Sequence, residues 1–249
     1  MKKFKYLLLL ALGAMMATSC YKSDNDDRVV YLGFSTVDKA SNDAMMLLLD
    51  NGVKLNPQNV LVSTPIGQRV IVSFSLGKEY EAGAPFNYDA DIYASKVVLT
   101  KGVTQMTAAN QDSIGNDGFY SMNGITWGGG FLNVYFGILY NGTPHMITMA
   151  DNAIDGPQVV TDTLKLEFRQ NAKGQNVGYR MNGLASFNIQ SYLDAAKANS
   201  KDTLIVRVNT DLLGGETSKY DIHYPTSYYG NFGTEGLTAE WLNAVSGVE

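Results

Sequence analysis

The chain has 249 residues, one cysteine and 25 glycines, and its formal net charge at pH 7 is −5. An acidic surface repels phosphate backbones, which argues against nucleic acid as a partner, and a single cysteine excludes an internal disulfide. Many glycines and aromatic residues without a long amphipathic helical pattern predict an all-β fold. The length suits one large or two small domains.

Residues 1–19 have the three-part layout of a secretory signal peptide. Three lysines stand within the first five residues, Leu7–Met16 is apolar, and small or hydroxyl residues lead into Cys20. Because cleavage before a cysteine resembles a bacterial lipoprotein signal, we predict that Cys20 is lipidated and attaches the chain to a membrane. The alternatives are an ordinary signal peptide and an uncleaved membrane helix, but about ten apolar residues are too few to span about 30 Å of hydrocarbon.

Residues 20–28 form the next segment, which contains four acidic or amide residues in a row at 24–27. This composition predicts a flexible, solvated tether after the lipid anchor. An acidic run at this place resembles the export signal that carries lipoproteins of Bacteroidetes to the outer face of the outer membrane. We therefore expect an outer-membrane lipoprotein exposed at the cell surface, with a periplasm-facing anchor as the alternative.

Residues 29–105 are predicted to form a small β-barrel. Asn51-Gly52 stands between two apolar runs, which is a strong hairpin signal because both central positions of a type I′ turn need positive φ. Gln68–Leu76 alternates apolar and polar residues, as a half-buried strand does. The expected strands are Val29–Val37, Met45–Leu49, Val53–Leu55, Val60–Ser63, Gln68–Leu76 and Ile92–Thr100.

Residues 106–118 are polar and glycine-containing, and we expect them to be an interdomain linker. Residues 119–249 are predicted to form an antiparallel β-sandwich with a C-terminal tail. Thr163–Gln170 shows strict alternation of apolar and charged residues. The expected strands are Phe119–Trp127, Phe131–Tyr140, His145–Met149, Thr163–Gln170, Tyr179–Ile189, Leu204–Val208 and Tyr220–Tyr224, with short helices at Asp194–Asn199 and Glu240–Val245.

Catalytic and metal-binding motifs are scarce in the sequence. The two histidines, His145 and His223, lack any short ligand spacing, although distant strands could still bring them together. No nucleophile elbow, P-loop or dinucleotide fingerprint is present, and lipidation would remove the one cysteine as a nucleophile. We therefore expect no enzyme activity, no metal and no cofactor.

Aromatic residues crowd the last thirty positions and the start of the second domain. Tyrosine and tryptophan combine a flat apolar face with a polar tip, which suits stacking on sugars or protein interfaces. Tyr228, Tyr229 and Phe232 lie outside a clear strand, so they are candidate ligand contacts, with a place in the core as the alternative. Trp127 and Phe131 are expected in the core.

Several short pieces of sequence together resemble one known family. The pieces are Leu48–Gly52, Gln68–Val72, Val98–Lys101, Asn110–Asp117, Trp127 with Leu132–Val134, Pro144–His145, Leu166–Ala172 and Gly183–Phe187. In their order and spacing they resemble the NigD-like lipoproteins of Bacteroidetes over nearly the whole chain. The resemblance implies an OB-like N-terminal barrel followed by a β-sandwich. That family is named for its place beside a bacteriocin gene, and the resemblance implies no chemistry.

Three sites match the Asp-Ser/Thr-aliphatic O-glycosylation pattern of the same phylum, and Ser113, Thr163 and Thr203 are the candidate acceptors. Two functions of different class remain. The chain is either a surface binding or accessory module for a glycan, peptide or envelope protein, or a structural or protective component linked to bacteriocin production or immunity. Exposed aromatic residues around a concave groove would favour the first, and an evenly polar surface would favour the second.

Overall fold

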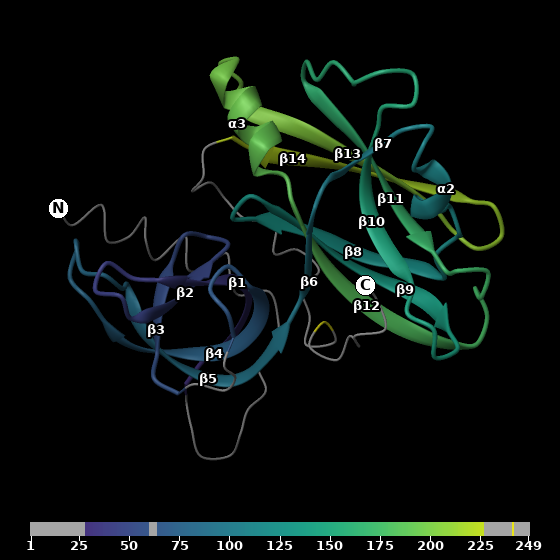
Figure 1. The fold of residues 1–249 in the computed structure, drawn as a ribbon. Coiled ribbons are helices and arrows are strands. Elements are labelled where there is room, and N and C mark those ends of the chain that lie inside the picture. Colours follow the sequence, from purple (N-terminus) through teal and green to yellow (C-terminus); the bar gives the residue numbers. More distant parts are fainter. Residues whose placement is uncertain (1–27, 60–63, 227–240, 242–249) are drawn as a thin grey trace. The chain divides into compact units, whose positions relative to one another are not determined.

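The computed structural model describes residues 28–59, 64–226 and 241 (Figure 1). The chain divides into two compact units. The first contains the described residues up to Val98 together with Trp241, and the second begins at Leu99 and contains the described residues through Thr226. Each unit has its own buried apolar core, and both are built mainly from strands. The predicted all-β fold class is therefore confirmed.

The first unit is a closed five-stranded barrel. Its strands are β1 (Val30–Lys39), β2 (Met45–Leu49), β3 (Lys54–Pro57), β4 (Arg69–Glu79) and β5 (Tyr88–Val97). They follow the order β1-β2-β3-β5-β4, and β4 closes the barrel by pairing with β1. Neighbouring strands are antiparallel except β3 and β5, which are parallel. A small closed barrel of five strands confirms the expected OB-like domain.

The Asn51-Gly52 hairpin lies where the sequence predicts it, between β2 and β3, but it is not a type I′ turn, because Gly52 has a positive φ and Asn51 does not. Gly52 has a φ of 77°, and its amide donates to the carbonyl of Leu49. Alternation along the strands fills the barrel with apolar side chains, because successive residues point to opposite faces. The barrel core consists of Val37, Leu47, Leu49, Leu55, Val70, Val72, Phe74, Ala90 and Ile92.

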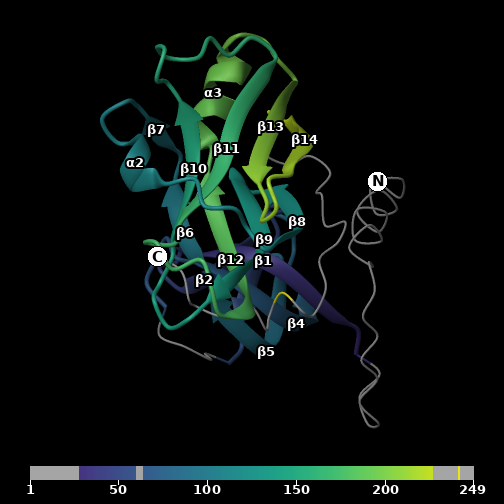
Figure 2. The same ribbon diagram turned by 90° about the vertical axis from the view of Figure 1, so that its right-hand side faces the viewer.

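The second unit contains a five-stranded sheet of order β14-β13-β11-β10-β7 and a four-stranded sheet of order β6-β12-β9-β8. Figure 2 shows the five-stranded sheet from left to right as β7, β10, β11, β13 and β14. The strands are β6 (Leu99–Gly102), β7 (Thr104–Met106), β8 (Ser121–Gly128), β9 (Phe131–Tyr140), β10 (Met146–Asn152), β11 (Thr163–Asn171), β12 (Tyr179–Asn188), β13 (Thr203–Asp211) and β14 (Thr217–Pro225).

Both sheets of the second unit are mixed rather than purely antiparallel. The pairs β10 with β7, β11 with β13, and β12 with β6 are parallel, and the other pairs in the two sheets are antiparallel. The sandwich itself is as predicted, but the parallel pairs could not be predicted from the sequence. Alternation of apolar and polar residues along a strand is the same whether its neighbour runs parallel or antiparallel.

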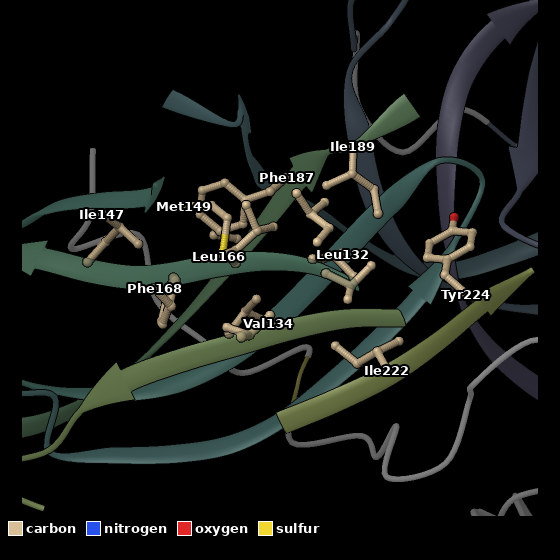
Figure 3. Close-up of a cluster of buried hydrophobic side chains, with 14 of the residues drawn as sticks. Leu132, Val134, Ile147, Met149, Leu166, Phe168, Phe187, Ile189, Ile222 and Tyr224 are labelled. Carbon is tan, nitrogen blue, oxygen red and sulfur yellow. The ribbon is translucent and has the colours of Figure 1, made fainter. Parts of the chain in front are cut away.

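The core of the second unit lies between its two sheets. Leu132 and Val134 point inward from β9, Leu166 and Phe168 point inward from β11, and all four are at most 1% exposed (Figure 3). At the centre, the rings of Phe119 and Phe168 stack with centroids 4.5 Å apart. Phe136 and Phe187, from the four-stranded sheet, meet Phe168 edge-on at 5.1 and 5.8 Å.

The boundary between the units lies before the predicted one. We expected the barrel to extend to residue 105 and a linker to span 106–118. Instead β6 pairs with β12, and β7 pairs with β10, so residues 99–106 give one strand to each sheet of the second unit. Asp117 also pairs with Gln170. Strands as short as β6 and β7 leave too few residues for an alternating pattern, so the polar residues around them were interpreted as a linker.

Two short helices complete the second unit. They are α2 (Gln111–Ile114) and α3 (Gln190–Ala198), and α3 replaces and extends the single helical turn expected at Asp194–Asn199. Within the described ranges, neither helix is long and apolar enough to cross a membrane. The helix expected at 240–245 falls outside the described residues, apart from Trp241.

A buried ion pair joins β4 of the first unit to the turn after β2. The Arg69 side chain is 1% exposed and the Asp50 side chain 12% exposed. The guanidinium donates from both terminal nitrogens to the two carboxylate oxygens of Asp50, at 2.5 and 2.8 Å. It also donates to Thr36 Oγ1 at 3.2 Å. A paired and bidentate arrangement is what allows these two charges to leave water.

Arg69→Ala is expected to lower the free energy of unfolding of the first unit by about 3–5 kcal/mol, because the Asp50 carboxylate would stay largely buried without its counter-charge. Urea unfolding followed by circular dichroism measures this change. The matched control is Arg207→Ala, which breaks the exposed bidentate pair between Arg207 and Asp221 and should change stability little. Equal losses in both variants would contradict the account of the buried pair.

Candidate functional site

Four of the residues predicted to be functional lie outside the described residues. They are the lipidation candidate Cys20 and the candidate ligand contacts Tyr228, Tyr229 and Phe232. Their roles stay predictions. Other aromatic residues from the same crowded stretch are described, and they are buried or half-buried. Tyr224 is 4% exposed and Trp241 is 1% exposed, and Tyr220 packs against the sandwich core.

The three candidate glycosylation sites lie in different surroundings within the second unit. Ser113 is exposed on α2, where its hydroxyl donates to the carbonyl of Asn110 at 2.8 Å. Thr163 and Thr203 are the first residues of the parallel neighbours β11 and β13. Thr163 is half-buried and Thr203 is exposed. Modification of any of the three stays a prediction.

The two histidines lie at opposite ends of the five-stranded sheet. His145 is fully buried, and its Nδ1 lies 2.9 Å from Gln170 Oε1, near the end of β11. His223 lies opposite Ile205, which in turn pairs with Thr163 at the start of β11. Seven residues of strand separate these places, or about 20 Å. They therefore do not form a two-histidine metal site. Among the described residues, no three metal-ligating side chains gather either.

The hydrogen bonds around His145 fix its role. Gln170 Nε2 donates to the carbonyl of Gly118 at 2.6 Å, so Gln170 presents its amide oxygen to the histidine. Nδ1 of His145 is therefore the donor in the hydrogen bond to Gln170 Oε1. His145 Nε2 is buried and has no hydrogen-bond partner, which leaves no path to a substrate. The imidazole is a structural element of this end of the sandwich.

Asp151 on β10 is the most deeply buried acidic residue in the described part of the chain, at 7% exposed. It accepts a hydrogen bond from the hydroxyl of Tyr192 on α3 at 2.9 Å and another from Gln158 at 2.6 Å. Gln158 also bonds the backbone of Lys165 on β11 in both directions. The carboxylate thus attaches both the helix and the loop after β10 to the sheet, which is a structural role.

The acid–base behaviour of this cluster follows from burial. Desolvation first, and then the hydrogen bond to the Asp151 carboxylate, raise the pKa of Tyr192 far above its ordinary value. Because the folded chain holds the phenol proton more tightly than the unfolded chain, its contribution to stability is complete below about pH 10 and is lost as pH rises above that.

Tyr192→Phe is expected to reduce the loss of stability of the second unit above about pH 10, since the variant has no phenol to ionise there. At neutral pH it should cost about 1 kcal/mol through the lost hydrogen bond to Asp151. Urea unfolding at pH 8 and at pH 11 measures both effects. Tyr179→Phe, which removes a hydroxyl from an exposed ring of the same unit, is the control. A wild-type pH dependence in Tyr192→Phe would contradict the assignment.

A pair of tyrosines, one exposed and one half-buried, lies where β9 ends and β12 begins. Tyr179 is 62% exposed, the largest exposed fraction of any aromatic side chain in the described ranges, and Val177 beside it is 60% exposed. Tyr179 lies opposite Tyr140 in the sheet, and the two rings meet edge-on with centroids 5.8 Å apart. Asn141 and Gln175 join the two adjacent loops through their side-chain amides. We call Tyr140, Asn141, Gln175, Val177 and Tyr179 the Tyr179 patch.

The loop that precedes Tyr179 is fixed at several points. Asp117 Oδ2 accepts from the amide of Ala172 at 2.7 Å, and the Asn176 side chain donates to the carbonyl of Gly118 at 2.9 Å. The same carbonyl accepts from Gln170. These bonds connect residues 170–176 to residues 117–118, so the patch is carried by an ordered loop. An ordered platform loses little conformational entropy when a ligand binds.

Gly178 is required for this arrangement. Its φ is 117°, in the region that favours glycine, and a Cβ at this position would meet the carbonyl oxygen of Tyr140 at 2.2 Å. Only a glycine therefore lets the loop close against the end of β9 and bring Tyr179 beside Tyr140. The polar turn at 171–178 is visible in the sequence.

The opposite face of the same strand end carries a second polar and aromatic arrangement. Arg180 points away from the sandwich core, and its guanidinium lies over the ring of Tyr120, 4.2 Å from the centroid. On this face Asn182 donates to the hydroxyl of Tyr135 at 2.7 Å. Arg180 and Asn182 therefore lie on the face opposite Tyr179 and are not part of the Tyr179 patch.

Sequence reasoning did not identify the Tyr179 patch. The sequence interpretation placed Tyr179 at the start of a strand and gave the most weight to the aromatic residues near the C-terminus. A usable signal was present: tyrosine directly after a glycine that ends an amide-rich turn is poorly placed for burial, because a strand end faces solvent on more sides than a strand centre does.

Comparison with known proteins agrees with the observed fold. Residues 102–224 match the family model of the NigD-like C-terminal beta sandwich domain. No curated protein matches the chain. A solved protein of unknown function from Bacteroides vulgatus has a TM-score of 0.73 and 23% identity, over 88% of this chain and all of that one.

Two further solved structures are similar. A protein from Parabacteroides distasonis, described as toxin-related, has a TM-score of 0.62 and 25% identity, over 80% of this chain and 96% of that one. A NigD-like immunity protein from Bacteroides caccae has a TM-score of 0.51 and 16% identity, over 80% of this chain and 99% of that one. The predicted resemblance is confirmed: residues 102–224 carry the NigD-like C-terminal β-sandwich domain.

Proposed function

We propose that the chain is a non-enzymatic, lipid-anchored envelope protein that binds a glycan through the Tyr179 patch. The observation that carries the proposal is the ring of Tyr179, 62% exposed at the start of β12, directly after a loop held by backbone and side-chain hydrogen bonds. Burying such a ring is favourable for the protein, so leaving it exposed at a fixed position suits contact with a ligand. The anchor is Cys20, and the expected place is the outer face of the outer membrane.

The chemistry of the patch favours a sugar. Tyr179 offers a flat face for the C–H groups of a pyranose ring, and Asn141 and Gln175 each offer both a donor and an acceptor for hydroxyl groups. A non-catalytic role is supported by the two groups that most resemble catalytic residues. His145 and Asp151 are both buried and committed to hydrogen bonds that hold loops and α3 in place.

A second candidate function is a protective or structural role linked to bacteriocin production or immunity, without a small ligand. It is favoured by the two solved structures described as toxin-related and as a NigD-like immunity protein. The two functions differ in what they require of the Tyr179 patch. A protective role that needs no glycan predicts no carbohydrate binding at all.

Binding to an array of bacterial surface glycans tests the proposal. Tyr179→Ala is expected to weaken binding about tenfold or more, equivalent to at least about 1.4 kcal/mol, because the stacking surface is removed. Tyr93→Ala, which removes a tyrosine 48% exposed in the first unit, is the control and should bind normally. Absence of binding by the wild-type chain would favour the protective role. Loss of binding only in Tyr228→Ala or Tyr229→Ala would place the site in the C-terminal aromatic segment instead.

Cys20→Ala is expected to abolish incorporation of radiolabelled palmitate and to release the protein from the membrane fraction, because the thiol is the acylated group. The measurement is labelling in the native host followed by fractionation. Wild-type protein on intact cells should also be digested by added protease if the anchor faces outward. Labelling that persists in Cys20→Ala would refute the anchor, and protection from protease in intact but not in lysed cells would indicate the periplasm-facing alternative.

A further inference from the structure

The strands of the four-stranded sheet in the second unit contain no acidic residue. The whole chain has 24 Asp and Glu residues and a net charge of −5, yet none of these acids stands in β6, β8, β9 or β12. The charged residues of these strands are Lys101 and Arg180. The ammonium of Lys101 donates to the carbonyl of Ile147 at 3.0 Å, and Arg180 is exposed on β12. In an acidic chain, a sheet that carries only positive charge favours an anionic partner.

Arg180 differs from the other four arginines in having no carboxylate partner within the described part of the chain. The other four form ion pairs, namely Arg28 with Asp91, Arg69 with Asp50, Arg169 with Glu167 and Arg207 with Asp221. The Arg180 guanidinium instead lies over the ring of Tyr120. A ring face attracts a guanidinium but leaves the in-plane N–H groups to other acceptors, so Arg180 keeps donors for a planar anion.

The ring of Tyr120 reaches Arg180 because a side chain is missing between them. Gly137 on β9 pairs with Ser121 of β8 on one side and with Asn182 of β12 on the other. Tyr120 is held at this row, since its amide donates to the carbonyl of Gly137 at 2.9 Å. A Cβ at Gly137 would lie 3.3 Å from Tyr120 Cδ1 and 2.4 Å from Ser121 Oγ. Glycine at this position therefore lets the tyrosine ring lie across β9 and meet the arginine of β12.

Neutral amides lie beside the guanidinium. Asn182 is two residues from Arg180 along β12 and therefore on the same face. Its side-chain nitrogen donates to the hydroxyl of Tyr135 at 2.7 Å, and its oxygen accepts from the Asn123 side chain of β8 at 3.2 Å. Both asparagines are exposed, and amides donate to and accept from hydroxyl groups. We call Tyr120, Asn123, Arg180 and Asn182 the Arg180 site.

The charge of the Arg180 site suits a carboxylate better than a phosphate. One guanidinium matches the single negative charge and the two oxygens of a carboxylate, which it can bind in a bidentate manner. A phosphate monoester carries a charge of about −1.5 to −2 at pH 7, and it is bound best where several cations or the N–H groups at the start of a helix converge. The Arg180 site offers one cation on a strand, with neutral amides around it.

We propose that the Arg180 site binds a carboxylated sugar, such as a uronic acid residue of a polysaccharide. The carboxylate pairs with the guanidinium, which Tyr120 holds in place, and the sugar hydroxyls bond the amides of Asn123 and Asn182. This site is separate from the Tyr179 patch, which lies on the opposite face of β12 and contains no charged side chain. Each site can therefore bind its ligand without the other.

Calorimetric titration of the full-length protein with two matched oligosaccharides tests the inference. The first is an oligomer of galacturonic acid, and the second is the same oligomer with its carboxylates converted to methyl esters. The acid is expected to bind the wild type at least about tenfold more tightly than the ester, because only the acid can pair with Arg180. In Arg180→Gln this preference should be lost, with the affinity for the acid lowered at least about tenfold.

Arg207→Gln is the matched control, because it removes one positive charge from another strand of the same unit and should keep the preference for the acid. Equal losses in Arg180→Gln and Arg207→Gln would overturn the inference, since they would show attraction to overall charge alone. Equal binding of acid and ester by the wild type, or no binding of the acid, would overturn it as well.

A short glutamate peptide separates a sugar from other carboxylates. The peptide presents carboxylates without hydroxyl groups, so it is expected to bind at least about tenfold more weakly than the galacturonic acid oligomer. Peptide binding as tight as that of the oligomer would overturn the assignment to a sugar. Arg180→Gln should keep the circular dichroism spectrum of the wild type, because the replaced side chain is exposed.

Discussion

The second unit depends on the contacts that Phe168 makes between its two sheets. Its ring stacks on Phe119 and meets Phe136 and Phe187 edge-on, so one side chain of the five-stranded sheet contacts the four-stranded sheet and the segment that precedes β8. Gly183 makes room for this cluster, because a Cβ there would lie 2.6 Å from the Phe136 ring. Since no disulfide is possible, such apolar contacts supply the stability of the unit.

The same cluster positions the candidate site. Burial of Phe119 fixes residues 117–118 beside the end of β11, and there Asp117 and the carbonyl of Gly118 receive the hydrogen bonds of residues 170–176. The loop held in this way ends at Gly178, and Tyr179 follows it onto the surface. The position of Tyr179 on the surface therefore depends on the packing of the sandwich core, through Phe119 and the loop that ends at Gly178.

Local sequence patterns predicted the individual strands and turns better than they predicted which strands pair with each other. The Asn51-Gly52 hairpin and the alternating strand at 163–170 were confirmed because each depends on neighbouring residues alone. The boundary at Leu99, the parallel pairs and the seat of Trp241 were missed, because each depends on contacts between residues distant in sequence. The sequence left the role of His145 open, and its burial shows only in the structure. Tyr179 was overlooked because the alternation of a strand does not indicate exposure at its end.

The central claim is that a rigid strand end of a NigD-like β-sandwich presents a tyrosine ring to a glycan. The most direct test is to label the ring carbons of tyrosine with ¹³C, assign the Tyr179 signal through Tyr179→Phe, and record spectra as surface glycan is added. The account predicts that the Tyr179 signal shifts and saturates, with a smaller shift at the adjacent Tyr140, while exposed Tyr93 of the barrel keeps its position. Saturable shifts at other tyrosines with an unchanged Tyr179 signal would contradict it.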